Sequence, residues 1–244
     1  MRIVLLITGL GVGGAERVVA DLADSFANSG HQVCLVYLRG EALTRPRSPA
    51  VRLVPMGLES IADLPRVLFG ALPRLVREFS PDVIHTHMFH ANIIGRLVRM
   101  LVKVPRLITT AHNTREGGWI RMAAYRATDF LSDVVTNVSQ EAVESFERAG
   151  AVRPGRMVAI HNGIDVSRYV RNREGAARVR TELAIPSSSK IILAIGSLTV
   201  QKDHRNLISA AALIRKSRDD FIVLIVGEGP LRKEIEEEIN FRGL

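Results

Sequence analysis

Residues 2–22 read RIVLLITGLGVGGAERVVADL and contain a complete strand–loop–helix pattern. The apolar run at 3–7 predicts a buried strand, and a glycine-rich loop follows it. From Ala15 onward apolar residues recur at spacings of three and four, with charged residues on the opposite face, as on an amphipathic helix. Gly30 is placed to end that helix, because glycine readily adopts the conformation required there. The stretch therefore predicts the first βα unit of a parallel sheet.

The same alternation of strand-like and helical patterns continues along the chain. Further strands are predicted at residues 32–38, 83–87, 106–111, 133–138 and 156–160. Ser139 is a candidate N-cap for the helix that follows the fourth of these strands. Residues 39–60 contain three prolines and are predicted to be irregular. The alternation indicates an α/β fold with a doubly wound parallel sheet.

The pattern is interrupted once and then restarts. Residues 167–189 are charged and predicted to be rich in loops, which is typical of a connection between domains. We therefore predict a complete first domain over 1–166 and a partial second domain over 190–244, with Asp203 capping a helix in it. Two strands cannot bury both faces of a parallel sheet, so we expect the sequence to stop inside the second domain.

Composition limits the classes of partner and compartment. The net charge of +8 favours an anionic partner, but aromatic residues make up only 5% and do not alternate with basic ones, which disfavours nucleic acid. Cys34 is the only cysteine, so we expect a reducing compartment, the cytoplasm. No apolar run reaches the roughly 20 residues that span a bilayer as a helix. The glycines after the first apolar run favour a buried strand over a signal peptide.

The glycine loop has several interpretations. Gly13 and Gly14 precede a helix whose N–H groups and dipole favour a bound anion, so the loop is a candidate phosphate site. The loop also matches the G-x-G-x-x-G pattern of dinucleotide-binding proteins. That pattern needs an acidic residue after the second strand, where Leu38 and Arg39 stand, although Arg39 would suit the 2′-phosphate of NADP. A tight turn without any ligand also remains open.

Three histidines are predicted near this loop. His85 and His87 end one strand and His112 follows the next, and the carboxyl ends of parallel strands meet at one edge of a sheet. The H-x-H spacing sends His85 and His87 to one face, where we expect polar residues lining the wall of a site. Without a third ligand the pair does not indicate a metal site, and we predict none. His112 is expected either to contact substrate or to make a structural hydrogen bond.

A fourth histidine, His161, follows a further strand and is predicted at the same edge, but it and His31 also have simpler interpretations. His161 follows a strand and precedes Asn162 and Gly163, which together predict a turn. His31 lies at the opposite edge of the sheet, and we expect it at the surface.

The second domain repeats the strand–loop–helix pattern in GSLTVQKDH, residues 196–204. Lys202 precedes a helix there, and a lysine is a mobile point charge that could meet a diphosphate. The alternative is a solvated surface lysine.

Two segments, 64–79 and 93–107, are rich in leucine and arginine. Arg96, Arg99 and Lys103 are spaced to form one basic helical face, which could lie on an anionic membrane surface. The alternative is that one face packs on the sheet and the other is solvated.

Seven stretches in this order resemble the GT-B glycosyltransferases of family 4. They are GGAERVVADLA (13–23), PDVIHTHMFHAN (81–92), TAHNT (110–114), VSQEAVESF (138–146), IHNGID (160–165), GSLTVQKDH (196–204) and VGEGPLRKEIEEEI (226–239). The resemblance implies two Rossmann-like domains around one cleft. It also implies a retaining enzyme that transfers sugar from a UDP- or GDP-sugar to a cell-envelope polysaccharide, glycolipid or lipid-linked acceptor, without cofactor or obligatory metal.

The resemblance also assigns roles to residues. His112 matches a histidine near the reacting sugar, and Lys202 matches the lysine that stabilises the leaving diphosphate. The residues expected to bind substrate are Gly13, Gly14, Glu16, His87, Asn162, Gly163, Gly196 and Ser197. An NADP-dependent oxidoreductase and a non-catalytic nucleotide-binding module remain the alternatives.

The sequence departs from the family pattern in two places. Ser197 follows Gly196 where the family often has an arginine. A pair of glutamates seven residues apart, which grips the donor in the family, would lie downstream of Leu244, because EIEEEI at 234–239 is instead typical of a charged helix face. The donor site is therefore expected to be incomplete in this chain.

Overall fold

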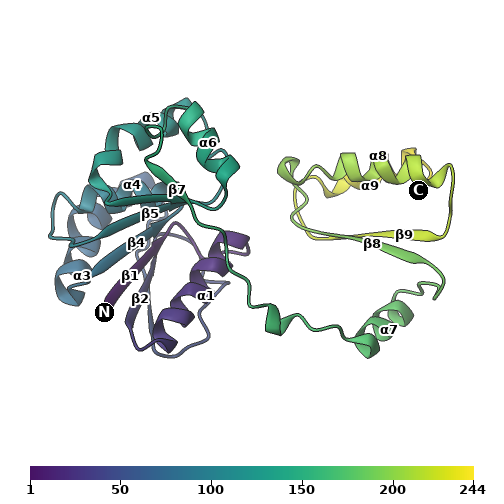
Figure 1. The fold of residues 1–244 in the computed structure, drawn as a ribbon, viewed down its shortest axis with the longest axis horizontal. Helices are drawn as coiled ribbons and strands as arrows, with labels where there is room; N and C mark the ends of the chain where they lie inside the picture. Colours follow the sequence, from purple (N-terminus) through teal and green to yellow (C-terminus); the bar gives the residue numbers. More distant parts are fainter. The chain divides into compact units, whose positions relative to one another are not determined.

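The computed structural model describes residues 1–244, the side chain of Arg168 excepted. It divides them into two compact units, Met1–Ile164 and Asp165–Leu244 (Figure 1). The first unit contains a seven-stranded parallel sheet and the second a two-stranded parallel sheet. The predicted α/β class is therefore confirmed.

The first unit is a doubly wound sheet covered by helices. Its strands are β1 (Arg2–Ile7), β2 (Gln32–Tyr37), β3 (Val51–Pro55), β4 (Val83–His87), β5 (Leu107–Ala111), β6 (Val134–Asn137) and β7 (Met157–Ala159). Its helices are α1 (Gly14–Asn28), α2 (Leu64–Arg66), α3 (Leu72–Phe79), α4 (Phe89–Val98), α5 (Trp119–Thr128) and α6 (Gln140–Arg148), with a π-helical stretch, Val67–Ala71, between α2 and α3 and 3-10 turns at Ile61–Asp63 and Asp129–Leu131. The strand order β3-β2-β1-β4-β5-β6-β7 reverses direction between β1 and β4, where open α/β sheets bind their ligands.

Alternate residues of β1 supply the two faces of the core. Ile3, Leu5 and Ile7 pack in one cluster with Val19 of α1. Leu6 packs on the other face with Leu75 of α3 and Ile94 of α4. A third cluster joins α4, α5 and α6 on that second face. Figure 1 shows α1 on one side of the strands and α4, α5 and α6 on the other. This layering leaves the carboxyl ends of β1, β4 and β5 at one edge.

Local signals from the sequence explain the helix ends. Ser139 accepts a hydrogen bond from the backbone N–H of Ala142, which confirms its predicted role as N-cap of α6. Gly30 adopts a positive φ of 81° after the end of α1, as predicted.

Two predictions for the first unit were wrong. The region predicted to be irregular contains β3, an edge strand that pairs with β2. One side of an edge strand has no neighbouring strand, so a backbone N–H is not needed at every position. Pro55, which has no N–H, is therefore tolerated at its end. Residues 160–165 form no turn, so the turn predicted at Asn162 and Gly163 is absent. These residues instead have no regular secondary structure.

The second unit contains α7 (Arg173–Glu182), β8 (Lys190–Ile195), α8 (His204–Arg215), β9 (Phe221–Val226) and α9 (Arg232–Phe241), with 3-10 turns at Val166–Arg168 and Val200–Lys202. Helix α7 lies in the segment that we predicted to be loop-rich. Asn172 caps it by accepting from the N–H of Gly175, and its alanine, arginine and glutamate residues favour a helix. Asp203 precedes α8 with φ of 46°, but its side chain accepts no capping hydrogen bond, contrary to prediction.

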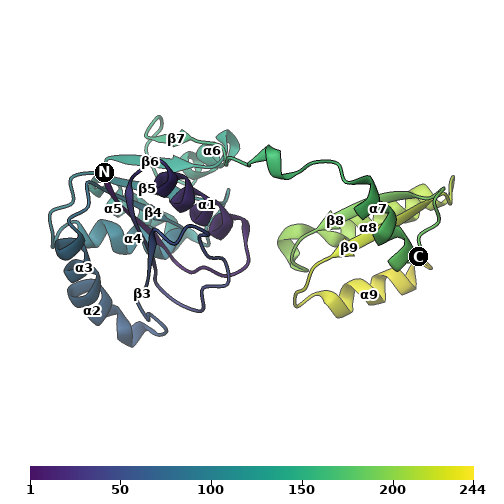
Figure 2. The same ribbon diagram turned by 90° about the horizontal axis from the view of Figure 1, so that it is seen from below.

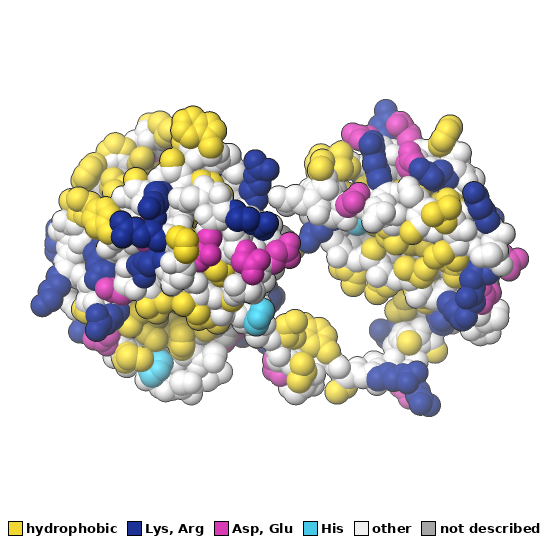
Figure 3. Space-filling model, turned by 45° about the horizontal axis from the view of Figure 1, so that its top comes forward, with side chains coloured by type: hydrophobic (Ala, Val, Ile, Leu, Met, Phe, Trp, Pro, Cys, Tyr) yellow, Lys and Arg dark blue, Asp and Glu magenta, His cyan; other side chains and the backbone are white. Residues whose placement is uncertain are grey.

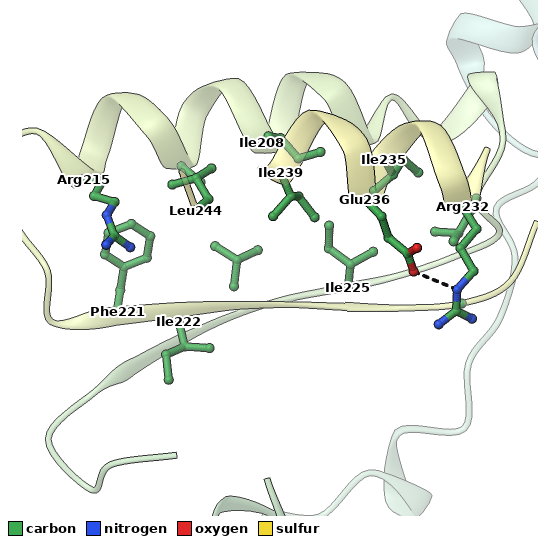
Figure 4. A pocket seen from close by; sticks show the side chains of 14 residues that line it. Ile208, Arg215, Phe221, Ile222, Ile225, Arg232, Ile235, Glu236, Ile239 and Leu244 are labelled. Atoms are coloured by element: carbon green, nitrogen blue, oxygen red, sulfur yellow. Dashed lines mark hydrogen bonds and ion pairs between the residues drawn. The ribbon is translucent and has the colours of Figure 1, made fainter. Parts of the chain in front are cut away.

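The interior of the second unit is thin. Leu198, Ile208 and Ile235 form its buried cluster. An apolar pocket of about 470 Å³ lies between β9 and the helices α8 and α9. Side chains such as that of Ile239 point into it (Figure 4). Leu193 of β8 remains 55% exposed.

Candidate functional site

The glycine loop lies at the carboxyl edge of the first sheet and is anchored by the segment after β2. The carbonyl of Leu10 accepts from the backbone N–H of Thr44 at 2.8 Å, and the Thr44 hydroxyl donates to the carbonyl of Gly11 at 2.6 Å. Gly13 and Gly14 are exposed where α1 begins. The loop is thus a fixed support for an exposed helix terminus.

Glu16 occupies part of that terminus. Its carboxylate folds back over Gly13, so that a Cβ on Gly13 would collide with it. The first N–H groups of a helix have no partner within the helix, and a carboxylate is stabilised beside them. The terminus therefore already holds a negative charge, which favours a ligand that offers hydroxyl groups over one that offers phosphate.

The strand ends bring the predicted histidines together. The rings of His85 and His87 lie on one face of β4 with centroids 4.0 Å apart, as the H-x-H spacing predicted. His87 Nδ1 lies 3.0 Å from His112 Nε2, across from β4 to the end of β5. His85 Nε2 lies 2.7 Å from the hydroxyl of Thr110. These side chains form the histidine cluster: His85, His87 and His112.

Burial keeps the histidine cluster neutral. Desolvation lowers the pKa of His112 to about 4 and that of His85 to about 3, and it holds the pKa of His87 well below its usual range. In a pair of neutral imidazoles, one ring donates the hydrogen bond between them through its single N–H. The ring that accepts this bond carries its own hydrogen on its outer nitrogen. The outer nitrogens, His87 Nε2 and His112 Nδ1, are both buried without a partner among the described residues.

Only one member of that pair is open to a ligand. His87, predicted to line the wall of the site, is 2% exposed and lies beneath His112. His112 is partly exposed. Of this pair, only the ring of His112 therefore reaches the surface, and His87 contacts it from the interior.

A buried network fixes the backbone of His112. Glu116 accepts from the backbone N–H of His112 at 3.1 Å and from the Tyr125 hydroxyl at 2.5 Å. Asn92 donates to the Tyr125 oxygen at 3.0 Å and accepts from the Thr86 hydroxyl at 2.7 Å. Burial raises the pKa of Glu116. The sequence reasoning missed Glu116, whose one signal is an acidic residue inside a glycine-rich loop.

Backbone strain marks the end of β4. Met88, directly after His87, has φ of 72° and ψ of 159°, in a region that non-glycine residues rarely adopt. Such strain costs on the order of 1–3 kcal/mol and clusters at functional sites. Here it turns the chain sharply from β4 into α4 and thereby sets the position of His87.

The second unit brings three predicted residues together at the carboxyl end of β8. A Cβ on Gly196 would lie 3.5 Å from Lys202 Cδ, so the lysine stem lies against this glycine. Lys202 is exposed, and in the part of the chain that the structure describes no acidic side chain pairs with it. His204, 6% exposed and missed by the sequence reasoning, lies with Nε2 3.2 Å from the carbonyl of Ser197 and holds this loop.

The glycine-containing loop after β9 supports the loop that carries Gly196 and Lys202. A Cβ on Gly227 would collide with the backbone of Gly196, and one on Gly229 would collide with Leu198. The backbone N–H of Leu198 donates to the carbonyl of Glu228 at 2.9 Å. The loop after β9 therefore packs directly against the loop that carries Lys202, and only glycine fits at its two contact points.

Two predicted substrate-binding residues stand apart. Asn162 and Gly163 lie in the exposed segment after β7. Among the described contacts, none joins them to the histidine cluster. His161, also predicted at this edge, has Nδ1 3.2 Å from the carbonyl of Val138, and among the described contacts none joins it to the histidine cluster. His31 is partly exposed at the surface.

The predicted basic helical face is wrong. Arg96 is fully buried and donates to the hydroxyls of Ser132 and Thr109 and to the carbonyl of Tyr125. Helix α4 ends at Val98, so Arg99 and Lys103 do not continue a helical face. In segment 64–79 the apolar side packs on the core and the arginines are solvated, as in the alternative to a membrane-facing surface.

Neither a metal centre nor a spanning segment is found in the described residues. No group of three or more histidine, cysteine, aspartate or glutamate side chains is placed there to hold a metal ion. No helix in that part of the chain has the length and apolar character to cross a membrane.

Comparison with known proteins matches both units. The model of Glycosyltransferase Family 4 matches residues 12–168, and that of Glycosyl transferases group 1 matches residues 176–244.

Relatives and solved structures agree with this match. A GDP-mannose-dependent alpha-(1-6)-phosphatidylinositol dimannoside mannosyltransferase of Mycobacterium tuberculosis is 27% identical over 93% of this chain and 61% of its own length. A UDP-Gal:alpha-D-GlcNAc-diphosphoundecaprenol alpha-1,3-galactosyltransferase of Escherichia coli is 22% identical over 92% and 61%. The crystal structure of Anabaena HepE in complex with UDP-glucose has a TM-score of 0.82 at 19% identity, over 100% of this chain and 66% of that one. The chain thus has the GT-B fold and spans about three fifths of the length of these curated relatives.

Proposed function

The chain belongs to glycosyltransferase family 4, and we propose that it transfers a sugar from a UDP- or GDP-sugar to a cell-envelope polysaccharide, glycolipid or lipid-linked acceptor, with retention of configuration. The names of the relatives support nucleotide-sugar donors and lipid-linked acceptors. The observation that carries the proposal is Lys202, which lies over Gly196 at the carboxyl end of β8 and has no acidic partner among the described residues.

In this proposal the second unit binds the donor diphosphate. The Lys202 ammonium is free to move onto a phosphate oxygen, and it stabilises the negative charge that develops as the nucleotide leaves. Gly196 and Ser197 allow the diphosphate to approach the backbone closely. A cation of the protein supplies the required charge, so we propose no cofactor and no obligatory metal.

The first unit binds the acceptor and the reacting sugar. The Glu16 carboxylate beside Gly13 and Gly14 accepts hydrogen bonds from acceptor hydroxyls. His112, which burial keeps neutral at physiological pH, lies with its partly exposed ring against the reacting sugar. We further propose that the enzyme acts in the cytoplasm at the inner membrane surface, where lipid-linked acceptors of the kind named for its relatives would be met.

Nucleotide binding to this chain tests the proposal. Isothermal titration with UDP and with GDP should show binding of one of them, and Lys202→Ala should weaken it about ten-fold, as for loss of a charge-assisted hydrogen bond. Lys216→Ala, also exposed in the second unit, is the matched control and should bind like the parent. Equal affinity of Lys202→Ala and parent would contradict the donor site. Binding of NADPH with no response to UDP or GDP would favour the oxidoreductase alternative.

A further inference from the structure

An open groove separates α5 from the end of α6 in the first unit. Its volume is about 840 Å³, which is in the range of ligand sites and too large for a packing defect between two helices. Small residues make up much of its lining and leave it wide: Gly117, Gly118, Ala123, Ala127, Ala149 and Gly150. The groove therefore has room for a ligand of more than one ring.

One indole ring and three guanidinium groups line this groove. Trp119, the first residue of α5, is 79% exposed, so its ring is open to a ligand. Arg126 comes from α5, Arg115 from the loop before it and Arg148 from the end of α6, and all three are exposed. No lining residue is acidic, and among the described residues no carboxylate pairs with these arginines. Figure 3 shows hydrophobic and basic side chains across the upper part of the first unit, where the α5 side is turned toward the viewer.

This combination of side chains suits an acidic carbohydrate. The C–H face of a sugar ring packs on an exposed indole, and a carboxylate accepts two parallel N–H bonds from a guanidinium group. In a uronic acid both features belong to one residue, because the carboxylate is carried by the ring that stacks. Ser145 and Arg148 line the groove from α6, across from the α5 residues, so a chain of sugars between the helices meets both walls.

The groove continues from the loop that carries His112. Thr114 and Arg115, two and three residues after His112, belong to its lining. Glu116 anchors this loop by accepting from the backbone N–H of His112 and from the Tyr125 hydroxyl. A sugar held at His112 therefore has the rest of its chain close to the groove.

We propose that the groove between α5 and α6 is a subsite for the acceptor, and that it binds carboxylate-bearing sugar residues next to the sugar that reacts. Trp119 stacks on one ring, and Arg115, Arg126 and Arg148 bind the carboxylates. The net charge of +8 accords with a polyanionic ligand. The inference rests on the proposal that the first unit binds the acceptor, and it specifies that acceptor as an acidic glycan.

Intrinsic fluorescence gives a direct test, because Trp119 is the only tryptophan in the chain. Tetragalacturonate or a hyaluronan tetrasaccharide should change its emission in a saturable way as a sugar ring covers the indole. The neutral maltotetraose should bind about ten-fold more weakly, because it offers no carboxylate to the arginines. Added salt should weaken the response to the acidic sugars through screening. An unchanged Trp119 spectrum with both acidic oligosaccharides would overturn the inference.

Isothermal titration with the better-binding acidic oligosaccharide distinguishes this groove from other exposed surfaces. Arg126→Gln and Trp119→Ala should each bind about five-fold more weakly than the parent. Matched controls elsewhere on the first unit, Arg77→Gln and Phe69→Ser, should bind like the parent.

Two results would overturn the inference. One is equal affinity of both groove variants and the parent for the oligosaccharide. The other is binding to phosphatidylglycerol vesicles that the groove variants weaken while their oligosaccharide binding is unchanged, which would assign this face to a bilayer. UDP or GDP binding by Arg126→Gln should equal that of the parent, so failure of the oligosaccharide result leaves the donor proposal separately testable.

Discussion

His85, His87 and His112 are three imidazoles that the first unit keeps uncharged, and this has a consequence for acid stability. Their pKa values in the folded state lie below the ordinary value near 6.5 because burial disfavours the charged form. The unfolded chain therefore binds more protons than the folded one below about pH 6.5, and stability falls as the pH drops from there through about 4. Each histidine removes up to about 1.4 kcal/mol per pH unit in that window.

Urea unfolding followed by circular dichroism, at neutral pH and at about pH 5, measures this effect. His85→Gln, which keeps a polar partner for Thr110 but cannot titrate, should reduce the pH dependence. A urea midpoint for the parent that stays constant over this range would mean that the cluster is solvated and titrates normally.

Arg96 provides a second prediction at the residue scale. Its guanidinium donates to three hydroxyls, those of Thr109, Thr128 and Ser132, and to a backbone carbonyl, and burial lowers its pKa to about 10. Arg96→Met fills similar space but removes every one of these donors from buried oxygen atoms, so we expect a loss of about 2–4 kcal/mol in unfolding free energy. Arg74→Met, on the solvated side of α3, should change stability by less than about 0.5 kcal/mol. A loss for Arg96→Met as small as that of the control would show that water replaces its contacts.

At the residue scale, local pattern predicted positions but not partners. The carboxyl ends of parallel strands lie at one edge of a sheet. The positions of the predicted strands alone were therefore enough to predict that His85, His87 and His112 lie close together. Arg96 and Glu116 were misread or missed because their hydrogen-bond partners lie on other elements. No spacing in the sequence encodes those contacts.

At the element scale, the closeness of α4 to β4 depends on Gly95. A Cβ there would lie 2.5 Å from Thr86 Cγ2, so alanine would force the helix away from the strand. We expect Gly95→Ala to destabilise the first unit by about 1–3 kcal/mol, as overpacked cores do. Thermal unfolding measures the change.

Gly70 in the π-helical stretch is the matched control. A Cβ there meets no atom within 4 Å, so Gly70→Ala should be neutral or stabilise by up to about 1 kcal/mol. If Gly95→Ala behaved like this control, α4 would have room to shift on the sheet.

Elements with strong periodicity were predicted well and marginal ones were not. Helix α1 was predicted because its apolar and charged faces alternate cleanly. Strand β3 is five residues long beside several prolines, and α7 buries none of its residues, so neither produces a clear pattern. Their formation depends on tertiary pairing and on helix propensity respectively.

At the scale of the whole molecule, the two units should differ in stability. The first has three extensive core clusters, whereas three buried residues form the cluster of the second, beside a pocket of about 470 Å³. We expect two urea transitions, with the second unit unfolding at the lower concentration. Circular dichroism should record both transitions. Coincident transitions would show that the units unfold together.

The two-stranded sheet of the second unit has a further consequence, for association between molecules. Among the described residues β8 and β9 pair only with each other, so each offers a free edge of backbone N–H and C=O groups. The run FIVLIV in β9 has no charge and no proline, which is typical of segments that add strands from other chains. Lys190 and Asp220 place charges at one end of these strands only. At high concentration this chain should therefore form intermolecular β-structure, beginning at the edges of β8 and β9.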